Sequence, residues 1–278
     1  MSKNKKEEKM KDHLSDSDDL LGYLKTKAER HRSYKTYTSL SRIEENIFKN
    51  HCLYLSDGSN WNDTYDSENF SSNKVDKYFG MCFSFSKSEN VAMWMLYGGK
   101  GQSGGMINFT YSHLKHIMEC KSQINLGYFE GDKFVVVQTL NNDQFEKNLV
   151  DILYYSDQGN TYDIKRSDDV IKNIRKGIVD QIKYVKKKFP WNYENECRMI
   201  YRINREKISN NKISTIQISI PKNIVKKLSN RVYNAPNSVE IKYNPSELNG
   251  QIKWNLCKDC AKREDFCVKK ECNNRILR

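Results

Sequence analysis

The chain has 278 residues, of which 37% are hydrophobic and 29% are charged, and its formal net charge is +12. No apolar run reaches the roughly 20 residues that a membrane-spanning helix needs, and the first residues contain no hydrophobic segment of the kind found in signal peptides. We therefore expect a cytoplasmic protein without a membrane partner.

The excess of lysine and arginine favours a partner that carries phosphate, because neutralised phosphates release their condensed counterions. Nucleic acid is the commonest partner of a strongly basic domain. A general bias of the genome toward lysine and asparagine would give the same charge without any such partner, and both interpretations stay open at this point.

The first 30 residues are expected to form a charged, flexible arm. Within it, residues 15–19 are rich in serine and aspartate, which are suited to cap a short helix at residues 20–24. We expect the folded domain to occupy residues 31–250 and a basic, cysteine-rich tail to occupy residues 251–278.

Within this domain, strands are predicted where apolar residues alternate or are β-branched between turns. They cover residues 52–56, 79–85, 106–111, 134–137, 213–220 and 239–243. The β-branched run at 134–137 suggests a central strand. Helices are predicted from apolar positions three or four residues apart, or from a leading proline. They cover residues 39–50, 88–97 and 221–228.

Residues 143–188 are predicted to be mainly helical, since residues 167–169 form a suitable N-terminus and an apolar stripe follows. The stripe consists of Ile171, Ile174, Ile178, Ile182 and Val185. Pro190 should end this helix. Strands and helices intermix without a regular βαβ repeat, which favours a mixed α+β fold.

Residues 193–201 read as a strand that opens with two acids, Glu194 and Glu196. Side chains two residues apart in an extended chain point to the same face. Two adjacent carboxylates repel each other unless a cation, or a reaction that develops positive charge, makes use of them. This pair is therefore the strongest indication of an active site.

Eight cysteines in a cytoplasmic chain should be mostly thiols, and Cys52, Cys82, Cys120 and Cys197 look like small core residues. The remaining four crowd near the C-terminus and resemble a tetrathiolate zinc site. They are Cys257, Cys260, Cys267 and Cys272. The wider spacing of the second pair leaves free thiols as an equal alternative.

Three ordered groups of motifs resemble the bacterial domain-of-unknown-function family 2971, from about residue 34 to residue 220. The first group comprises residues 34–39, 53–56 and 61–63, and the second comprises residues 81–86, 93–98 and 104–107. The third is the pattern formed by Trp191, Glu194, Glu196 and Arg198. Thr64 stands where the family usually has proline, so the loop after residues 62–63 is expected to differ.

The order of elements is also similar to that of ADP-ribosyltransferases of the diphtheria-toxin and poly-ADP-ribose-polymerase type. This resemblance implies a mainly antiparallel split sheet with flanking helices, and NAD as substrate. It places Tyr37 and Thr38 on a first strand beside nicotinamide, and Ser84 and Ser86 at the serine-rich end of a middle strand. The histidine of one major subclass and the arginine of another are absent from the first strand.

The resemblance gives the acids their roles. Cleavage of the nicotinamide–ribose bond develops oxocarbenium charge on the sugar, which Glu196 would stabilise, while Glu194 would orient or deprotonate the acceptor. Ser84 or Ser86 would hold Glu196, and Trp94 or Tyr97 would stack near nicotinamide. The alternative is structural: Glu194 and Arg198 would form surface ion pairs, and Trp94 and Tyr97 would belong to the core.

We therefore expect an NAD-dependent ADP-ribosyltransferase-like enzyme that modifies nucleic acid, RNA rather than DNA. Such families commonly act as bacterial toxins or phage-defence effectors, so a neutralising antitoxin protein is a further expected partner. The alternatives are a non-catalytic nucleic-acid-binding module and an NAD glycohydrolase that uses water as the acceptor.

Overall fold

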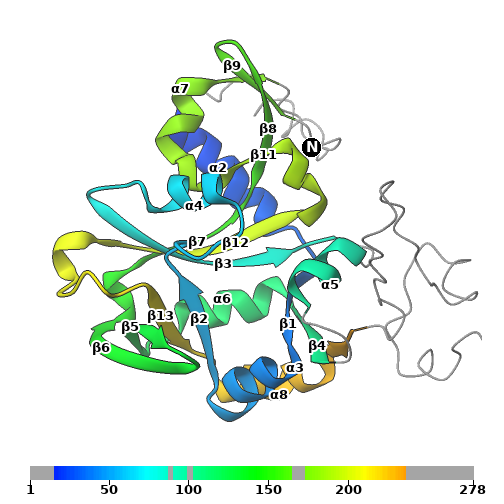
Figure 1. Cartoon of the computed structure of the whole chain (residues 1–278), viewed down its shortest axis with the longest axis vertical. Coiled ribbons are helices and arrows are strands. Elements are labelled where there is room, and N and C mark those ends of the chain that lie inside the picture. The colour runs from blue at the N-terminus through cyan, green and yellow to red at the C-terminus, as the bar shows by residue number, and fades with distance from the viewer. Residues whose placement is uncertain (1–15, 87–89, 99–102, 165–172, 236–278) are drawn as a thin grey trace, which may run out of the picture.

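The computed structural model describes residues 16–86, 90–98, 103–164 and 173–235, and its fold is mixed α+β with a mainly antiparallel sheet, as predicted (Figure 1). The main sheet contains β1 (Tyr34–Ser39), β2 (Cys52–Ser56), β3 (Asp76–Ser84), β4 (Gly104–Phe109), β5 (Gln123–Glu130), β6 (Lys133–Asn141), β7 (Glu146–Asp151), β12 (Glu196–Asn204), β13 (Thr215–Ser219) and β14 (Val232–Asn234). The second sheet contains β8 (Leu153–Gln158), β9 (Thr161–Ile164), β10 (Asn173–Arg175) and β11 (Lys186–Lys188).

The helices pack around these two sheets. They are α2 (Ser17–Ala28), α3 (Leu40–Arg42), which continues into the π-helical η1 (Ile43–Lys49), α4 (Thr64–Ser71), α5 (Val91–Tyr97), α6 (Tyr111–Glu119), α7 (Lys176–Val179) and α8 (Lys222–Leu228). Short 3-10 segments are η3 (Asn142–Gln144), η4 (Asp180–Val185), η5 (Phe189–Glu194), η6 (Arg205–Lys207) and η7 (Ser229–Arg231). Among the described residues, none of the helices is long and apolar enough to cross a membrane.

Strand β3 is the point at which the main sheet splits. One edge of β3 pairs with β12 along its whole length, from Glu196 opposite Ser84 to Asn204 opposite Asp76. The other edge meets β1 only at Ser84 and β2 only at Gly80. The two strands therefore diverge from β3, as Figure 1 shows, and each continues into its own branch of the sheet.

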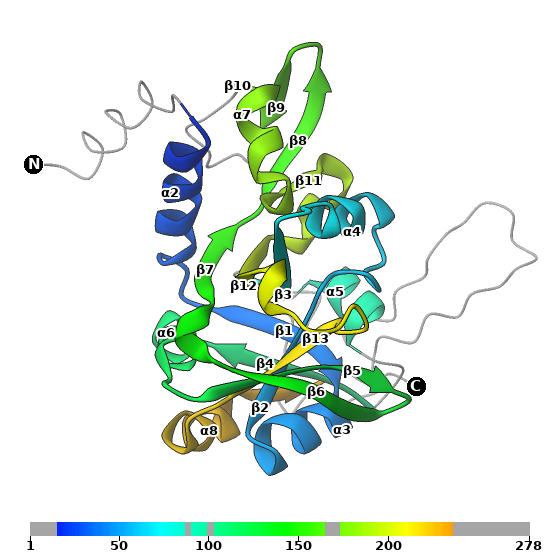
Figure 2. The ribbon, with the colours of Figure 1, turned by 90° about the vertical axis from the view of Figure 1, so that its left-hand side faces the viewer.

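Two hydrophobic cores lie on opposite sides of the layer formed by β3, β12 and β7. Phe79 and Phe83 of β3 contribute to the core that α6, α8 and η1 cover. Tyr78, on the opposite face of β3, contributes to the core that α2, α7 and the second sheet surround. Figure 2 shows these two parts of the molecule above and below β3 and β12. The alternation of side chains along a central strand explains how one strand supplies both cores.

Residues 17–28 form the packed helix α2. The short helix predicted at residues 20–24 is therefore confirmed and is longer than expected, whereas the flexible arm expected around it was wrong for these residues. Asp16 caps the helix by accepting hydrogen bonds from the backbone N–H groups of residues 18 and 19. Leu20, Tyr23, Leu24 and Ala28 are buried, and their spacing fits one face of a helix. The many charges on the other face concealed this stripe in the sequence. Residues 1–15 lie outside the described residues.

The prediction of a mainly helical segment at residues 143–188 was wrong. Residues 146–164 form β7, β8 and β9, and helical structure in the described part of this segment is confined to the end of η3, α7 and η4. Leu149 faces one core and Val150 faces the other, so the second half of β7 is buried on both faces. From Leu149 to Tyr155 the apolar residues are interrupted only by Asp151, and such a run does not distinguish a buried strand from a buried helix by its periodicity. Residues 165–172, including the expected helix N-terminus and Ile171, lie outside the described residues.

The β-branched run at residues 134–137 lies at an edge of the main sheet. Strand β6 is the last strand in the order of the main sheet and not a central one, and Val136 is 49% exposed. The register between β5 and β6 shifts at Leu126 and Gly127, which is typical of a β-bulge. The β-branched run therefore lies on an edge strand next to this irregularity. The last predicted strand, at residues 239–243, lies outside the described residues.

Candidate functional site

A cavity of about 460 Å³ lies where β1 and β2 diverge from β3. Between the pairings at Gly80 and Ser84, no other described strand covers this edge of β3. The strands that diverge here line the cavity with Lys35, Thr36, Tyr37, Tyr54, Met81, Cys82, Phe83 and Ser84. The other side is lined by Arg42, Asn60, Trp61, Asn62, Asp63, Asp66, Met93, Tyr97, Lys187, Glu194 and Glu196.

The two predicted acids reach this cavity by a turn and not by an extended strand. Glu194 ends η5, Asn195 has the left-handed backbone (φ 43°, ψ 61°), and β12 begins at Glu196. Asparagine adopts this conformation more readily than most residues. The predicted strand is therefore wrong for residues 193–195, but both carboxylates are buried and line the same cavity.

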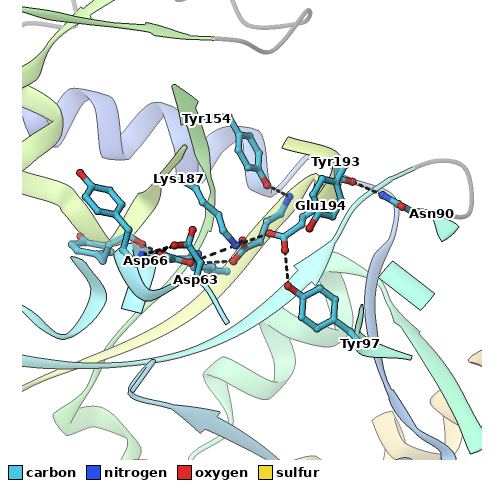
Figure 3. Close-up of polar contacts among 12 residues, drawn as sticks. Asp63, Asp66, Asn90, Tyr97, Tyr154, Lys187, Tyr193 and Glu194 are labelled. Atoms are coloured by element: carbon cyan, nitrogen blue, oxygen red, sulfur yellow. Dashed lines mark hydrogen bonds and ion pairs between the residues drawn. The ribbon is translucent and has the colours of Figure 1, made fainter. Parts of the chain in front are cut away.

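Lys187 holds the two carboxylates together. Its ammonium group lies 2.6 Å from Glu194 Oε2 and 3.2 Å from Glu196 Oε2, and a third carboxylate, that of Asp66, lies 3.5 Å away. The ammonium also lies 4.9 Å from the centre of the Trp191 ring. Figure 3 shows Lys187 extending toward Glu194 and Asp66. A buried ammonium with three carboxylate neighbours is a fixed part of the structure, because removing it would leave buried charges unpaired.

Arg198 completes the network behind the cavity. Its two terminal nitrogens donate to both oxygens of Asp66, at 2.9 and 2.5 Å, and its Nε donates to Glu196. The guanidinium is fully buried and lies 4.6 Å from the centre of the Trp61 ring. A two-pronged contact with a carboxylate fixes both side chains in orientation as well as in position.

Local sequence signals place Asp66 in this network. Asp63 caps α4 by accepting from the backbone N–H groups of residues 65 and 66, which sets Asp66 in the first turn of the helix. Phe70 of the same helix packs over Gly80, where a Cβ atom would lie only 2.8 Å from the ring. Glycine at this position of β3 therefore allows α4 to approach the sheet closely.

The charges in this network are unbalanced, since three carboxylates share two cations. Burial raises the pKa of Glu196, but Arg198 and Lys187 outweigh this effect and hold its pKa well below the usual range. Burial and the charge of Glu196 raise the pKa of Glu194 to about 7. Burial also raises the pKa of Asp66 above its ordinary value. Because the contacts of Arg198 go to Asp66 and Glu196, Glu194 is the carboxylate with the least compensation.

Tyr97 approaches Glu194 from helix α5. Its hydroxyl donates to Glu194 Oε1 at 2.7 Å (Figure 3). Burial and the neighbouring Glu194 raise the pKa of Tyr97, so the phenol keeps its proton and acts as a donor. Asn90 caps α5 and also donates to the backbone carbonyl of Tyr193, which joins this helix to η5. The geometry of the Tyr97–Glu194 pair is thus fixed from both sides.

The Glu196 carboxylate is held by different groups from those expected. Among the described residues its side-chain partners are Arg198, Lys187 and the Cys82 thiol. Burial and Glu196 raise the pKa of Cys82, so the thiol is protonated. Ser84 lies opposite Glu196 on β3 and lines the cavity, but its hydroxyl accepts from the backbone N–H of Ser86 at 3.5 Å.

The other predicted ligand-binding residues divide between the cavity and its surroundings. Tyr37 and Tyr97 line the cavity, whereas Thr38, Ser86 and Trp94 are not among its lining residues. Trp94 is 3% exposed and packs edge-on against Tyr37, with ring centres 5.0 Å apart. It therefore supports the wall that Tyr37 forms, as the structural alternative for Trp94 anticipated.

Sequence reasoning did not identify Asp66 and Lys187 as site residues. Lys187 belongs to a run of three lysines that looks like a solvated segment, and Asp66 belongs to a polar segment near residues 61–66. The alternative of surface ion pairs for Glu194 and Arg198 was wrong, because both side chains are buried. The pattern of Trp191, Glu194, Glu196 and Arg198 was the one signal that pointed to this network.

The zinc prediction concerns residues that the structure does not describe. Cys257, Cys260, Cys267 and Cys272 lie outside the described residues, as does the rest of the expected tail at residues 251–278. Within the described ranges, no three histidine, cysteine or acidic side chains come together in a way that could hold a metal ion. The four cysteines in those ranges, Cys52, Cys82, Cys120 and Cys197, are free thiols, as predicted.

Comparison with known proteins supports part of the resemblance found in the motifs. Residues 93–199 match the model of a family described as "Protein of unknown function (DUF2971)". The matched range includes Tyr97, Lys187, Glu194, Glu196 and Arg198, which all belong to the buried network. No curated protein and no solved structure matches the chain. The family match therefore supports the relationship at residues 93–199 and leaves the activity to be inferred from the site.

Proposed function

We propose that this protein is an NAD-dependent ADP-ribosyltransferase-like enzyme that modifies nucleic acid, RNA in preference to DNA. The observation that carries the proposal is the pair Glu194 and Glu196, whose carboxylates line one cavity and bind one ammonium group. Their environments push their pKa values in opposite directions. Such a separation is typical of two carboxylates that perform different tasks in one reaction.

The ionised member of the pair suits the first half of the reaction. The bond between the nicotinamide nitrogen and ribose C1′ breaks, its electron pair leaves with the now neutral nicotinamide, and positive charge develops on the sugar. Arg198 and Lys187 keep Glu196 ionised although it is only 3% exposed. A fixed carboxylate of this kind stabilises positive charge most strongly where water is excluded.

The other member of the pair suits the second half. An acceptor oxygen or nitrogen attacks C1′ and must lose a proton, which a base with a pKa near the working pH accepts most effectively. Glu194 has a pKa of about 7 and is therefore divided between its acidic and basic forms near neutral pH. The Tyr97 hydroxyl fixes the orientation of this carboxylate through one of its oxygens.

The remaining lining residues suit a dinucleotide that contains aromatic rings and phosphates. The cavity is lined by the aromatic side chains of Tyr37, Tyr54 and Trp61 and by the cationic side chains of Lys35 and Arg42. Aromatic side chains bind ring systems by stacking or edge-on contact, and cations compensate the pyrophosphate. The net charge of +12 supports a polyanionic acceptor, which is why we propose nucleic acid in place of protein.

The test uses NAD labelled on its adenylate phosphate, incubated with the full chain and either RNA, DNA or no acceptor. We expect the label to appear on RNA, to disappear with Glu196→Gln and to fall strongly with Glu194→Gln. Glu206→Gln is the matched control, because Glu206 lies exposed in η6, away from the network. Thermal unfolding of each variant shows whether lost activity reflects lost structure.

Two other outcomes would replace this proposal. Free ADP-ribose released at the same rate with or without RNA would indicate an NAD glycohydrolase. Binding of RNA without any turnover of NAD would indicate a non-catalytic nucleic-acid-binding module.

A further inference from the structure

One branch of the main sheet has a face of unusual composition. In β2, β13 and β5, the side chains of one face enter the core, and they are Leu53, Leu55, Ile216, Ile218, Ile124 and Leu126. The alternate residues form the opposite face, which we call the outer face. Across it, Tyr54 pairs with Gln217, Gln217 with Asn125, and Asn125 with Thr139, in adjacent strands.

These four side chains are joined into a single polar row. The Thr139 hydroxyl donates to Asn125 at 3.0 Å, the Asn125 amide donates to Gln217 at 2.9 Å, and the Gln217 amide donates to the Tyr54 hydroxyl at 2.8 Å. Mutual hydrogen bonds hold the amide groups in fixed orientations. The Gln217 amide also donates to the Cys52 sulfur at 3.5 Å, so both of its N–H groups are used. A ligand can still use the second N–H of Asn125 and a second lone pair on each amide oxygen.

Beside this row the outer face carries an aromatic cluster. Phe129 and Phe134 lie opposite each other on β5 and β6, and both pack against Tyr54 with ring centres 5.0 and 5.1 Å from it. Phe129 is 44% exposed and the neighbouring Val136 is 49% exposed. Large exposed apolar side chains gathered on one surface indicate a binding site more often than single ones do.

The outer face also lacks charge, although 29% of the residues of the chain are charged. The described residues that alternate onto this face in β2, β13, β5 and β6 include no acid and no base. They are Cys52, Tyr54, Ser56, Thr215, Gln217, Ser219, Gln123, Asn125, Gly127, Phe129, Phe134, Val136, Thr139 and Asn141. Amides and rings without charge match the edges and faces of nucleobases, whereas phosphates would require cations.

Tyr54 connects the outer face to the cavity, because it belongs to the aromatic cluster and also lines the cavity. Arg42, which is exposed, lines the same cavity and offers a contact for a phosphate there. A strand of nucleic acid that lies on the outer face and reaches Tyr54 therefore meets a residue of the cavity that Glu194 and Glu196 also line.

We propose that the outer face of β2, β13, β5 and β6 binds the acceptor as single-stranded RNA, with unpaired bases stacked on Phe129 and Phe134. This inference rests on the proposed function and names the form of its acceptor. A duplex hides the faces of its bases within the stack, so an aromatic surface of this kind selects unpaired bases.

The experiment measures fluorescence anisotropy of a short labelled single-stranded RNA, and of the same sequence as a duplex, with the full chain and without NAD. Loss of one stacked base costs about 1–3 kcal/mol, so Phe129→Ala should weaken single-strand binding roughly 5- to 150-fold. Gln217→Ala should weaken it less. Val75→Ala is the matched control, since Val75 is 65% exposed and lies outside the outer face.

Equal affinities of the wild type and Phe129→Ala, preference for the duplex, or no binding by the wild type would overturn the inference. A face that binds a protein partner would give the first of these results. The outcomes also separate this inference from the proposed function. If label is transferred to RNA and Phe129→Ala leaves the Michaelis constant for RNA unchanged, the outer face is not the binding site and the proposed activity stands. If Phe129→Ala weakens RNA binding but the wild type does not turn over NAD, the outer face is the binding site and the proposed activity is wrong.

Discussion

Replacement of Arg198 by methionine tests the buried charge network most directly. Methionine keeps an unbranched side chain against Trp61 and Phe70 but removes every polar contact of the guanidinium. Asp66 loses both of its hydrogen bonds from Arg198, Glu196 loses its Nε donor, and the carbonyl of Tyr184 loses a donor at 3.0 Å. Among the described residues, Lys187 then remains as the one cation paired with these three buried carboxylates.

The expected cost follows from this loss of compensation. Removing one partner of a buried ion pair costs about 3–5 kcal/mol, because the other partner stays buried and unpaired. Each kcal/mol shifts the melting temperature of a domain of this size by about 2–4 °C. We therefore expect Arg198→Met to lower the melting temperature by about 6–20 °C. The cost of about 3–5 kcal/mol is a large part of the roughly 5–15 kcal/mol that holds a domain folded.

The same strand supplies the control. Arg202 of β12 pairs with Asp76 at 2.9 Å and with Glu146 at 3.1 Å, but its side chain is 41% exposed. Exposed pairs contribute at most about 1 kcal/mol each, so Arg202→Met should have a much smaller effect in the same urea and thermal unfolding experiments. Adding Asp66→Asn to Arg198→Met should restore part of the stability by removing one unpaired carboxylate. Equal losses for the two arginine variants would refute the reasoning.

Three further predictions concern the titration of Glu194 and the terminal cysteines. The pKa of Glu194 is near 7 in the folded state and lower in the unfolded state, so the wild type loses about 2–3 kcal/mol of stability as the pH rises from 5 to 8. Urea unfolding of Glu194→Gln should not show this loss, and parallel curves of stability against pH for the two proteins would contradict the assignment. Tyr97→Phe removes a hydrogen bond that lowers this pKa, so the loss should move to higher pH, and an unmoved curve would exclude the contact. Elemental analysis should find zinc in stoichiometric amount, reduced by Cys257→Ser, and metal-free protein with titratable thiols would contradict the predicted tetrathiolate site.

The positions of helices and strands were predictable from the sequence where the apolar residues followed a single periodicity. The strands at β2, β3, β4 and β13 and the helix α8 lie close to their predicted ranges, because their apolar residues alternate or recur on one face. Strand β7 was not recognised, since a strand buried on both faces shows no alternation. Helix α2 was missed as a packed element, since its apolar stripe is interrupted by charges that face solvent.

The candidate site was likewise predicted in part. The spacing of Glu194 and Glu196 predicted that two acids act together, and both line the cavity with Tyr37, Tyr97 and Ser84. An extended strand was expected to bring the two acids to one face. In the structure, the left-handed Asn195 and the ammonium of Lys187 bring them together.

The sequence by itself determined the mixed α+β composition, the acidic pair and the positive charge, because each is a property of composition or of neighbouring residues. Only the tertiary structure decided which cations compensate those acids. Asp66 and Arg198 are separated by 132 positions in the chain and meet because α4 packs over Gly80. The distance between charges and their burial determine how far a pKa moves, and neither quantity exists until β1, β2 and β12 have assembled around β3.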